Sequence, residues 1–447
     1  MKKKFLAVVL TAAASVSMAD VSLYGRVAVG VEEDGFQNST VPNNSNIQDF
    51  GSYFGIRGYD QVYGQTSAIW QVEQYLDLTS GQAYYNTTGG GLITPNPNNS
   101  SSFSQSGRIV NEINTLASSE SYLGLQGTWG RIRLGNLSNY MRSSMGAVDL
   151  YNHNNGVNGF NNYSRVNQLM PTTIRYDSPT WYGLSIAGAY SFQSSGLQGV
   201  SSINTSTNFN GGLNASYAGG VYSIGAGWEG GNFSVKLGTW VFQNVGSYST
   251  DLSSNVCSSS TPNACYQNAY TNRLELGYND PDGLIVGLGL QTTSGLGWAG
   301  WATSGGSWNN YVTNTGYNYQ GLTNNQYQTQ EMGGTVGWHL GQWTPKLGYM
   351  YGNNLMYGGN ITSVAAGTAN YIPNSGYQQV VAELDWNITP RTIVFLNFGQ
   401  EWYGNTVQNI AYCGTGCSLI KGANPVNATN QYLFNQASGA LGFSHTF

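Results

Sequence analysis

The sequence predicts an all-β protein, a 16-stranded antiparallel transmembrane β-barrel with short periplasmic turns and long extracellular loops. Three observations lead to this fold class. Alternating apolar and polar segments of about ten residues repeat along the chain, joined by short and long connections in strict order. Charged residues are 8 % of the chain, against roughly 25 % in soluble domains. The chain closes with GALGFSHTF, whose apolar face ends in an aromatic residue.

The predicted strands alternate with two kinds of connection. Short connections such as TWG, EGGN, DPDG and NITPR carry turn-forming residues, whereas the long ones are rich in Asn, Ser, Gly and Tyr. Closing the sheet removes unpaired edges, which lipid requires, and sixteen strands leave room for a water-filled channel. The stretch 211–219 fits a strand or a loop. The strands are expected at 21–32, 50–59, 65–77, 118–127, 130–138, 170–177, 183–193, 220–229, 232–243, 270–279, 283–293, 326–339, 342–352, 376–387, 390–402 and 432–447.

The beginning of the chain indicates export. Lys2, Lys3 and Lys4 precede a short apolar run and the small-residue site Ser17-Met18-Ala19. This pattern predicts a secretory signal peptide over residues 1–19, which leaves residues 20–447 for the barrel. No stretch offers the roughly 18 consecutive apolar residues that a transmembrane helix needs.

The segment ESYLGLQGTWGRIRLGN, residues 120–136, indicates which face of the sheet meets water. Ile132 and Leu134 share one face of its second strand, while Arg131 and Arg133 share the other. An arginine on the lipid face near the bilayer midplane would cost roughly 2–4 kcal/mol. We therefore expect the aliphatic face to meet lipid and the arginines to line an aqueous lumen. A soluble sandwich, with its apolar face inward, is the alternative.

The four cysteines fall in two local pairs. Because exported proteins form disulfides, we predict the bonds Cys257–Cys265 and Cys413–Cys417, each closing a short extracellular loop. Metal binding is the alternative use of cysteine pairs, but no histidine lies near them. The three histidines are far apart in the sequence, so we predict neither a metal site nor a cofactor.

Several segments carry a family resemblance. They are ADVSLYGRVAVGVE at the start of the barrel, FGIRGYD at 54–60, IWQVEQ at 69–74, YLGLQGTWGRIRLGN at 122–136, IRYDSPTWYGLS at 174–185, TPRTIVFL at 389–396 and the GFSHTF end. Together they resemble the trimeric general porins of the Neisseria type, shared with other β-proteobacteria. The stretch from about 200 to 375 matches only in pattern. The resemblance implies a homotrimer in the outer membrane of a Gram-negative bacterium, in contact with lipid and lipopolysaccharide.

The resemblance also implies that the third long loop, residues 139–168, folds into the barrel and narrows it; an external loop is the alternative. A short helix is expected within Met141–Leu150. In the family, acidic loop groups face basic wall groups, and Asp149 is the one acid of this loop. Asn136 replaces an arginine that the family often carries, which leaves charge selectivity open. With period-2 alternation, the predicted pore-lining residues are Arg26, Arg57, Glu73, Glu120, Arg131, Arg133, Arg142, Asp149, Arg165 and Arg175.

The sequence favours a pore for passive diffusion of ions and small hydrophilic solutes. A substrate-specific channel for sugars or one anion is the nearest alternative, and aromatic stacking in the lumen would distinguish it. An adhesive surface barrel could use the Tyr- and Asn-rich loops but would not need inward arginines. An enzyme is not predicted, because a nucleophile, a base and an orienting group have no obvious common place. A nucleic-acid partner is not predicted either.

Overall fold

The computed structural model describes most of the barrel. The described residues are 20–36, 44–79, 104–105, 108–109, 116–154, 156–164, 166–167, 169–192, 220–246, 266–294, 327–354, 356–357, 376–403 and 436–447. The predicted signal peptide, both cysteine pairs, Arg165 and the ambiguous segment 211–219 lie outside these ranges. The two disulfides therefore stay predictions.

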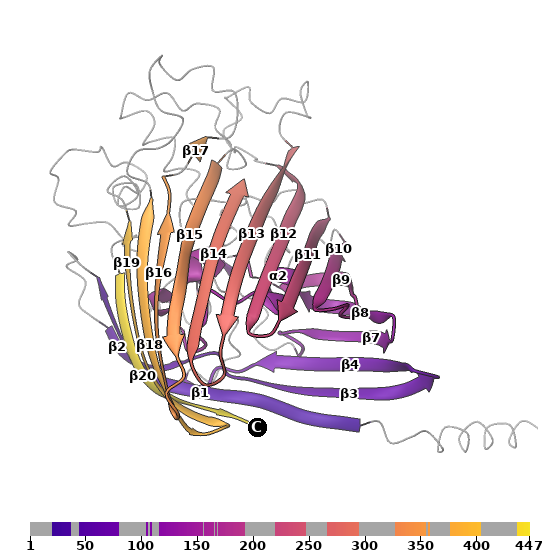
Figure 1. Ribbon diagram of the computed structural model, residues 1–447, viewed down its shortest axis with the longest axis horizontal. Coiled ribbons are helices and arrows are strands. Elements are labelled where there is room, and N and C mark those ends of the chain that lie inside the picture. The colour runs from indigo at the N-terminus through magenta and orange to yellow at the C-terminus, as the bar shows by residue number, and fades with distance from the viewer. Residues whose placement is uncertain are drawn as a thin grey trace, which may run out of the picture.

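One antiparallel sheet of 18 strands closes into a barrel (Figure 1). Two of its strands, β2 (Asn44–Asp49) and β17 (Met356–Tyr357), are short additions that pair with β1 and β15. The sixteen strands of the wall are β1 (Asp20–Phe36), β3 (Tyr53–Tyr63), β4 (Thr66–Tyr75), β7 (Ser121–Gly127), β8 (Gly130–Ser138), β9 (Leu169–Asp177), β10 (Leu184–Ser191), β11 (Val221–Gly230), β12 (Phe233–Gly246), β13 (Tyr266–Asn279), β14 (Leu284–Ser294), β15 (Tyr327–Trp338), β16 (Trp343–Gly352), β18 (Tyr377–Thr389), β19 (Thr392–Tyr403) and β20 (Gln436–Thr446). A separate hairpin joins β5 (Ser104–Gln105) to β6 (Arg108–Ile109).

The barrel closes where the first strand meets the last. β1 pairs with β20 from Arg26↔Thr446 to Phe36↔Gln436, and its first residues pair with β3. The chain end adds to this seam, because Gly25 and Phe447 exchange backbone hydrogen bonds of 3.1 and 3.0 Å. The aromatic terminus is therefore part of the closure.

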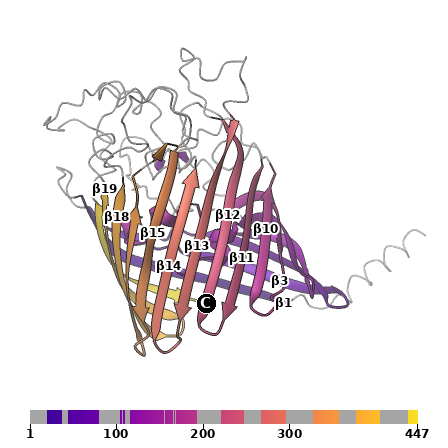
Figure 2. The same ribbon diagram turned by 45° about the horizontal axis from the view of Figure 1, so that its top comes forward.

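Each predicted strand overlaps one strand of the wall, which confirms the predicted fold class. The strand predicted at 130–138 is observed at Gly130–Ser138, and the other bounds shift by a few residues. The short connections of β11–β16 gather at one end of the barrel (Figure 2). Several short turns contain a glycine in the left-handed region, where other residues are strained; examples are Gly64 at φ 55°, Gly231 at φ 58° and Gly341 at φ 63°.

The outer face of the barrel is aliphatic. Ile132 and Leu134 expose 38 % and 54 % of their surface, whereas Arg133 between them exposes 4 %. This confirms the predicted facing of the aliphatic side chains. Within the described residues, no helix is both long and apolar enough to cross a membrane.

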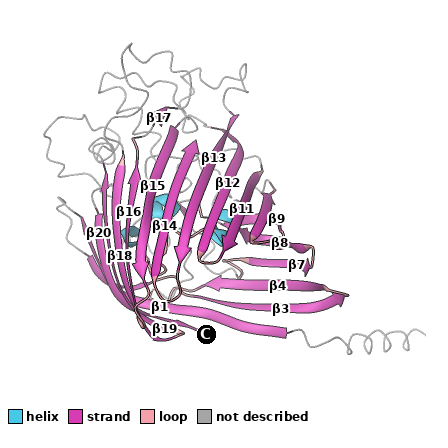
Figure 3. Cartoon of the chain, in the orientation of Figure 1, coloured by secondary structure: helices cyan, strands magenta, loops and turns pink. Residues whose placement is uncertain are grey.

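Three short helices lie inside the ring of strands: α2 (Tyr140–Ser144), the 3-10 helix η1 (Gly156–Asn158) and α3 (Asn161–Ser164) (Figure 3). All belong to residues 139–168, which we call loop 3. α2 ends earlier than the sequence predicted. Asn139 caps its start by accepting the Arg142 N–H at 2.9 Å, and the N–H groups of Gly146 and Ala147 turn instead to the Glu275 carboxylate. That wall carboxylate diverts the chain from the helical path.

Candidate functional site

Loop 3 crosses the lumen and rests on the inner face of strands β11 to β20, which we call the seat. Hydrogen bonds fix its course. The Glu275 carboxylate on β13 accepts the Gly146 and Ala147 N–H groups at 2.7 and 2.8 Å. On β15, the Thr335 hydroxyl donates to the Val148 carbonyl at 2.6 Å. Farther along, the Gln379 side chain on β18 donates to two loop carbonyls at 2.9 and 2.7 Å. The loop is thus held at several places along the wall.

Glycines on the seat let the loop approach the backbone of the strands. A Cβ at Gly287 on β14 would overlap the carbonyl oxygen of Ala147, and one at Gly399 on β19 would overlap that of Val157. Loop side chains fill the space over other positions, as the Tyr140 ring does over β11. Because interiors are close-packed, these contacts leave no room for larger residues. The wall glycines whose added Cβ would meet loop 3 are Gly225, Gly227, Gly238, Gly277, Gly287, Gly289, Gly348 and Gly399.

The seat also carries most of the buried carboxylates of the described residues. Buried carboxylates of the wall accept hydrogen bonds from loop 3: the Asn158 amide donates to Glu32 at 3.1 Å, and the Asn162 amide donates to Glu401. Loop 3 therefore supplies donors, and the wall supplies the acids. This explains why the loop sequence has a single acid. The buried carboxylates of the seat are Glu275, Glu331, Glu383, Asp385 and Glu401, with Arg273 and Lys346 as its buried cations. Glu32 on β1 and Asp77 are the other buried carboxylates among the described residues.

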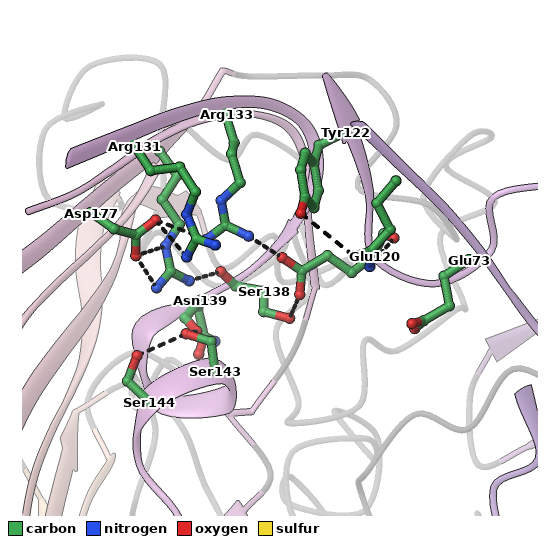
Figure 4. A network of polar contacts seen from close by, with 12 residues as sticks. Glu73, Glu120, Tyr122, Arg131, Arg133, Ser138, Asn139, Ser143, Ser144 and Asp177 are labelled. Carbon is green, nitrogen blue, oxygen red and sulfur yellow. Dashed lines mark hydrogen bonds and ion pairs between the residues drawn. The ribbon is translucent and has the colours of Figure 1, made fainter. Parts of the chain in front are cut away.

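The opposite wall is cationic. Arg133 on β8 donates to Glu120 at 2.6 Å and to Asp177 at 2.9 Å, so that it bridges two acids (Figure 4). Arg175 on β9 holds the other oxygen of Asp177 at 2.9 and 2.7 Å. Arg131 reaches Asp177 at 3.4 Å and remains partly exposed. Three guanidinium groups thus share two carboxylates, which leaves an excess of one positive charge.

The remaining predicted pore residues on the strands continue this cationic wall. Arg26 donates to the carbonyls of Phe50 and Gly51 and, at 3.2 Å, to Asn152 of loop 3. Arg57 is exposed near Ser22. Glu73 accepts hydrogen bonds from the hydroxyls of Tyr24, at 2.8 Å, and Ser119.

Two loop residues predicted to line the pore are placed differently from each other. Arg142 on α2 turns back to the Tyr75 hydroxyl of β4, on the cationic side. Asp149 stays within the loop, where its carboxylate accepts the Ser164 hydroxyl at 2.5 Å. Burial raises the pKa of Asp149, although the bond from Ser164 opposes that shift. The sequence placed Asp149 opposite the arginines, but the carboxylates that contact them come from the wall.

Tyrosines on the cationic wall have a guanidinium group over their rings. Arg57 lies 4.9 Å from the ring centroid of Tyr24, and Arg133 lies 5.0 Å from that of Tyr122. Such cation–π contacts hold the guanidinium groups in place. One face of each ring is therefore already used, which disfavours an aromatic stacking track for sugars at these positions.

Sequence reasoning missed Asp177 and the acids of the seat. Asp177 follows Arg175 by two residues on β9, so period-2 alternation could have placed both on one face. The same holds for Glu383 and Asp385 on β18, where Leu384 points the other way. No sequence spacing indicates that loop 3 covers these acids, because the covering residues are far away in the chain.

Comparisons with known proteins identify a family of outer-membrane barrels. The family profile described as Gram-negative porin matches residues 6–405. The major outer membrane protein P.IA of Neisseria meningitidis serogroup C is 25 % identical over 428 residues, which cover 88 % of this chain and 92 % of the relative. The P.IB protein of Neisseria sicca is 29 % identical over 199 residues, or 42 % of this chain and 47 % of the relative.

Two solved structures share the fold. The anion-selective porin from Comamonas acidovorans has a TM-score of 0.56 at 15 % identity and covers 96 % of this chain and 100 % of its own. The trimer form of OmpT from Vibrio cholerae has a TM-score of 0.51 at 14 % identity, with the same coverage of 96 % and 100 %. At such identities the likeness shows the fold alone.

Proposed function

This chain belongs to the Gram-negative porin family, and from the charges along its lumen we propose that its pore favours small anions over small cations. The protein resides in the outer membrane of a Gram-negative bacterium and forms a barrel through which ions and small hydrophilic solutes diffuse passively. The preference of the pore for anions or cations depends on which charged side chains a passing ion meets.

The observation that carries the proposal is the imbalance of charge on the wall opposite loop 3. We call this cationic wall, with the acids interspersed in it, the arginine wall. Arg142 reaches this side from loop 3, and Asp49 lies beside Arg26, since both bind Gly51. With these two residues included, cations outnumber acids on this side by six to four. A low-dielectric barrel concentrates such a field in the water of the lumen. The cations are Arg26, Arg57, Arg131, Arg133, Arg142 and Arg175, and the acids are Asp49, Glu73, Glu120 and Asp177.

The acids of the seat act on the ion from farther away. They are buried beneath loop 3, so the loop lies between them and the open lumen. Opposite charges on the two sides set up a transverse field that orients water and favours polar solutes. The net effect on a small ion comes mainly from the charges that reach the water, which are Arg57 and Arg131 of the arginine wall.

Reversal potentials in a potassium chloride gradient test the proposal. We expect a chloride-over-potassium permeability ratio above one at 0.1 M salt, where the Debye length is about 10 Å, and a smaller preference at 1 M, where it is about 3 Å. Arg57→Gln removes an exposed charge of the arginine wall and should lower the ratio.

Arg391→Gln is the matched control. Arg391 lies in the short turn between β18 and β19, outside the lumen wall, so its removal should leave the ratio unchanged. A cation preference in the wild-type protein would defeat the proposal. So would an equal effect of the two substitutions.

We also propose that the pore assembles as a homotrimer surrounded by lipid and lipopolysaccharide. Its support is the family membership and the solved OmpT structure, whose title describes a trimer form. Light scattering of the detergent-extracted protein should give the mass of three chains, and heating should convert it to monomers. A monodisperse monomer before heating would contradict this.

A further inference from the structure

A buried cluster joins loop 3 to the seat and has no role in the pore lining described above. His153 comes from loop 3, and Glu383 and Asp385 project two residues apart from the inner face of β18. All three residues are buried, with side-chain exposures of 3 %, 0 % and 9 %. Sequence spacing does not indicate the cluster, because His153 is far along the chain from Glu383 and Asp385.

Each member of the cluster points one buried atom without a hydrogen-bond partner toward the same place. These atoms are Nδ1 of His153, Oε2 of Glu383 and Oδ1 of Asp385. The imidazole nitrogen lies 4.0 Å from the first oxygen and 3.7 Å from the second, too far for hydrogen bonds. All three ligand atoms lie within 4.8 Å of one another. Leaving three buried polar atoms unpaired is costly, so their shared orientation calls for a common partner.

The surrounding side chains hold these atoms in place. The Lys346 ammonium group donates to the other oxygens of Glu383 and Asp385 at 2.7 and 2.8 Å, which leaves the inner oxygens free. The His153 ring stacks on Phe395 with centroids 4.3 Å apart, and the Asn397 amide binds the His153 carbonyl. Outer contacts of this kind orient the ligands of protein metal sites.

We propose that His153, Glu383 and Asp385 bind one divalent transition-metal ion of the Zn²⁺ type, which fastens loop 3 to the barrel wall. One imidazole nitrogen with two carboxylate oxygens is a three-ligand set that zinc accepts, with a water molecule in the fourth position. The imidazole argues against Ca²⁺ and Mg²⁺, which prefer oxygen ligands. Tetrahedral zinc would bring its ligand atoms to about 3.3–3.6 Å from one another. The two nitrogen–oxygen distances of 4.0 and 3.7 Å would shorten by up to roughly 0.7 Å, and a pair of ligand atoms 4.8 Å apart would shorten by about 1.2–1.5 Å.

A proton on His153 is the competing occupant. The two carboxylates and Lys346 leave the cluster one negative charge in excess when the imidazole is neutral. A proton on Nδ1 would balance that charge. It would nevertheless remain beyond hydrogen-bond distance of both oxygens, whereas a metal ion between them would contact all three atoms.

Metal retention by the folded full-length barrel tests the site. The purified protein, with its thiols alkylated so that cysteines cannot bind, is equilibrated with micromolar Zn²⁺, passed over a desalting column and analysed for metal. We expect one zinc per chain in the wild type. His153→Gln and Glu383→Gln should weaken binding at least tenfold, and excess Ca²⁺ should not displace the zinc.

The other histidines supply matched controls. His339 and His445 lie near short turns, bonded to Thr344 and Thr392, and His339→Gln and His445→Gln should retain zinc. Heat-modifiable migration on gels verifies that each variant forms a barrel. Wild-type protein that retains no zinc overturns the proposal, and so does a folded His153→Gln variant that binds zinc as the wild type does. If the wild type retains no zinc and His153→Gln alters the pH dependence of the channel current, the occupant of the cluster is a proton on His153.

Discussion

The arginine wall and the seat of loop 3 are built from similar strands, yet their inner faces differ in the charge that they carry and in their contact with loop 3. Outside, both present aliphatic residues such as Leu134 and Leu288, which expose 54 % and 53 % of their surface. Inside, the arginine wall carries long charged side chains, of which Arg57 and Arg131 reach water while Arg133 and Arg175 are buried in ion pairs. The seat carries glycines and carboxylates that receive a folded segment. Because lipid requires apolar side chains all around the outer face, the inward-facing residues determine the properties of the pore.

The two sides also satisfy their buried charges differently. On the arginine wall, charges pair with one another, as Arg133 does with Glu120 and Asp177. On the seat, carboxylates depend on donors from loop 3, such as the backbone N–H groups that bind Glu275. A buried carboxylate is costly unless it is hydrogen-bonded. Glu275 of the seat is therefore complete only with the loop in place, whereas the pairs of Arg133 with Glu120 and Asp177 need no group from loop 3.

The largest expected effect comes from filling the seat. Gly287→Val places a side chain where the Ala147 carbonyl now lies, and backbone cannot move aside locally. Overpacking of this kind costs about 1–3 kcal/mol or more, and the loop gives way before the barrel does. We expect a higher single-channel conductance and faster proteolysis of loop 3 in barrels that still assemble.

Gly188→Val is the matched control for this substitution. A Cβ at Gly188 on β10 meets no atom within 4 Å, so the same change should leave conductance unaltered. An unchanged conductance in Gly287→Val would mean that loop 3 does not depend on contact with the seat.

The two walls also differ in how well their inner residues could be predicted from the sequence. The strands were predictable because lipid imposes alternation on every one of them, and the bounds of β8 agree to the residue. The inward arginines were predictable for the same reason. Alternation says nothing about a loop, so it could not indicate that the Asp149 carboxylate binds Ser164 within loop 3. The acids beneath loop 3 were missed because their burial depends on a segment from elsewhere in the chain, as Glu401 depends on Asn162.

The second effect concerns the outer face. Leu134→Arg puts a charge on the lipid side of β8, about four residues from the short turn, and should lower the free energy of unfolding by up to roughly 2–4 kcal/mol, the cost near the midplane. Gln71→Arg is its counterpart on the inner face of β4, where Gln71 contacts the Tyr122 hydroxyl. It should fold normally and raise anion preference. Denaturant titrations in detergent and reversal potentials measure both, and equal stability of the two variants would contradict the assigned faces.

The third effect compares charges on the two inner walls. Arg133→Gln removes one positive charge from the arginine wall and should shift the reversal potential toward cations. It should do so more than Arg131→Gln, because Arg133 stands about 7 Å farther from the turn. Glu331→Gln removes one negative charge beneath loop 3, where its side chain accepts the Gln291 amide and the Tyr377 hydroxyl. Its shift should be opposite and smaller. A larger shift for Glu331→Gln would mean that the seat, not the arginine wall, dominates selectivity.

The smallest effect is expected at Asp149. The sequence alone would predict that Asp149→Asn changes selectivity as strongly as an arginine substitution, in the opposite direction. In the structure its carboxylate accepts the Ser164 hydroxyl within loop 3, and burial raises its pKa. A raised pKa in the folded state means that the barrel gains stability from the neutral form, and that this gain is lost as the pH rises through that pKa. Asparagine mimics the neutral form, so the variant should be at least as stable as the wild type at neutral pH and should lose that advantage at low pH. Reversal potentials of the two proteins should nearly coincide. A shift toward anions as large as the Arg133→Gln shift toward cations would place the Asp149 carboxylate in the path of the ions.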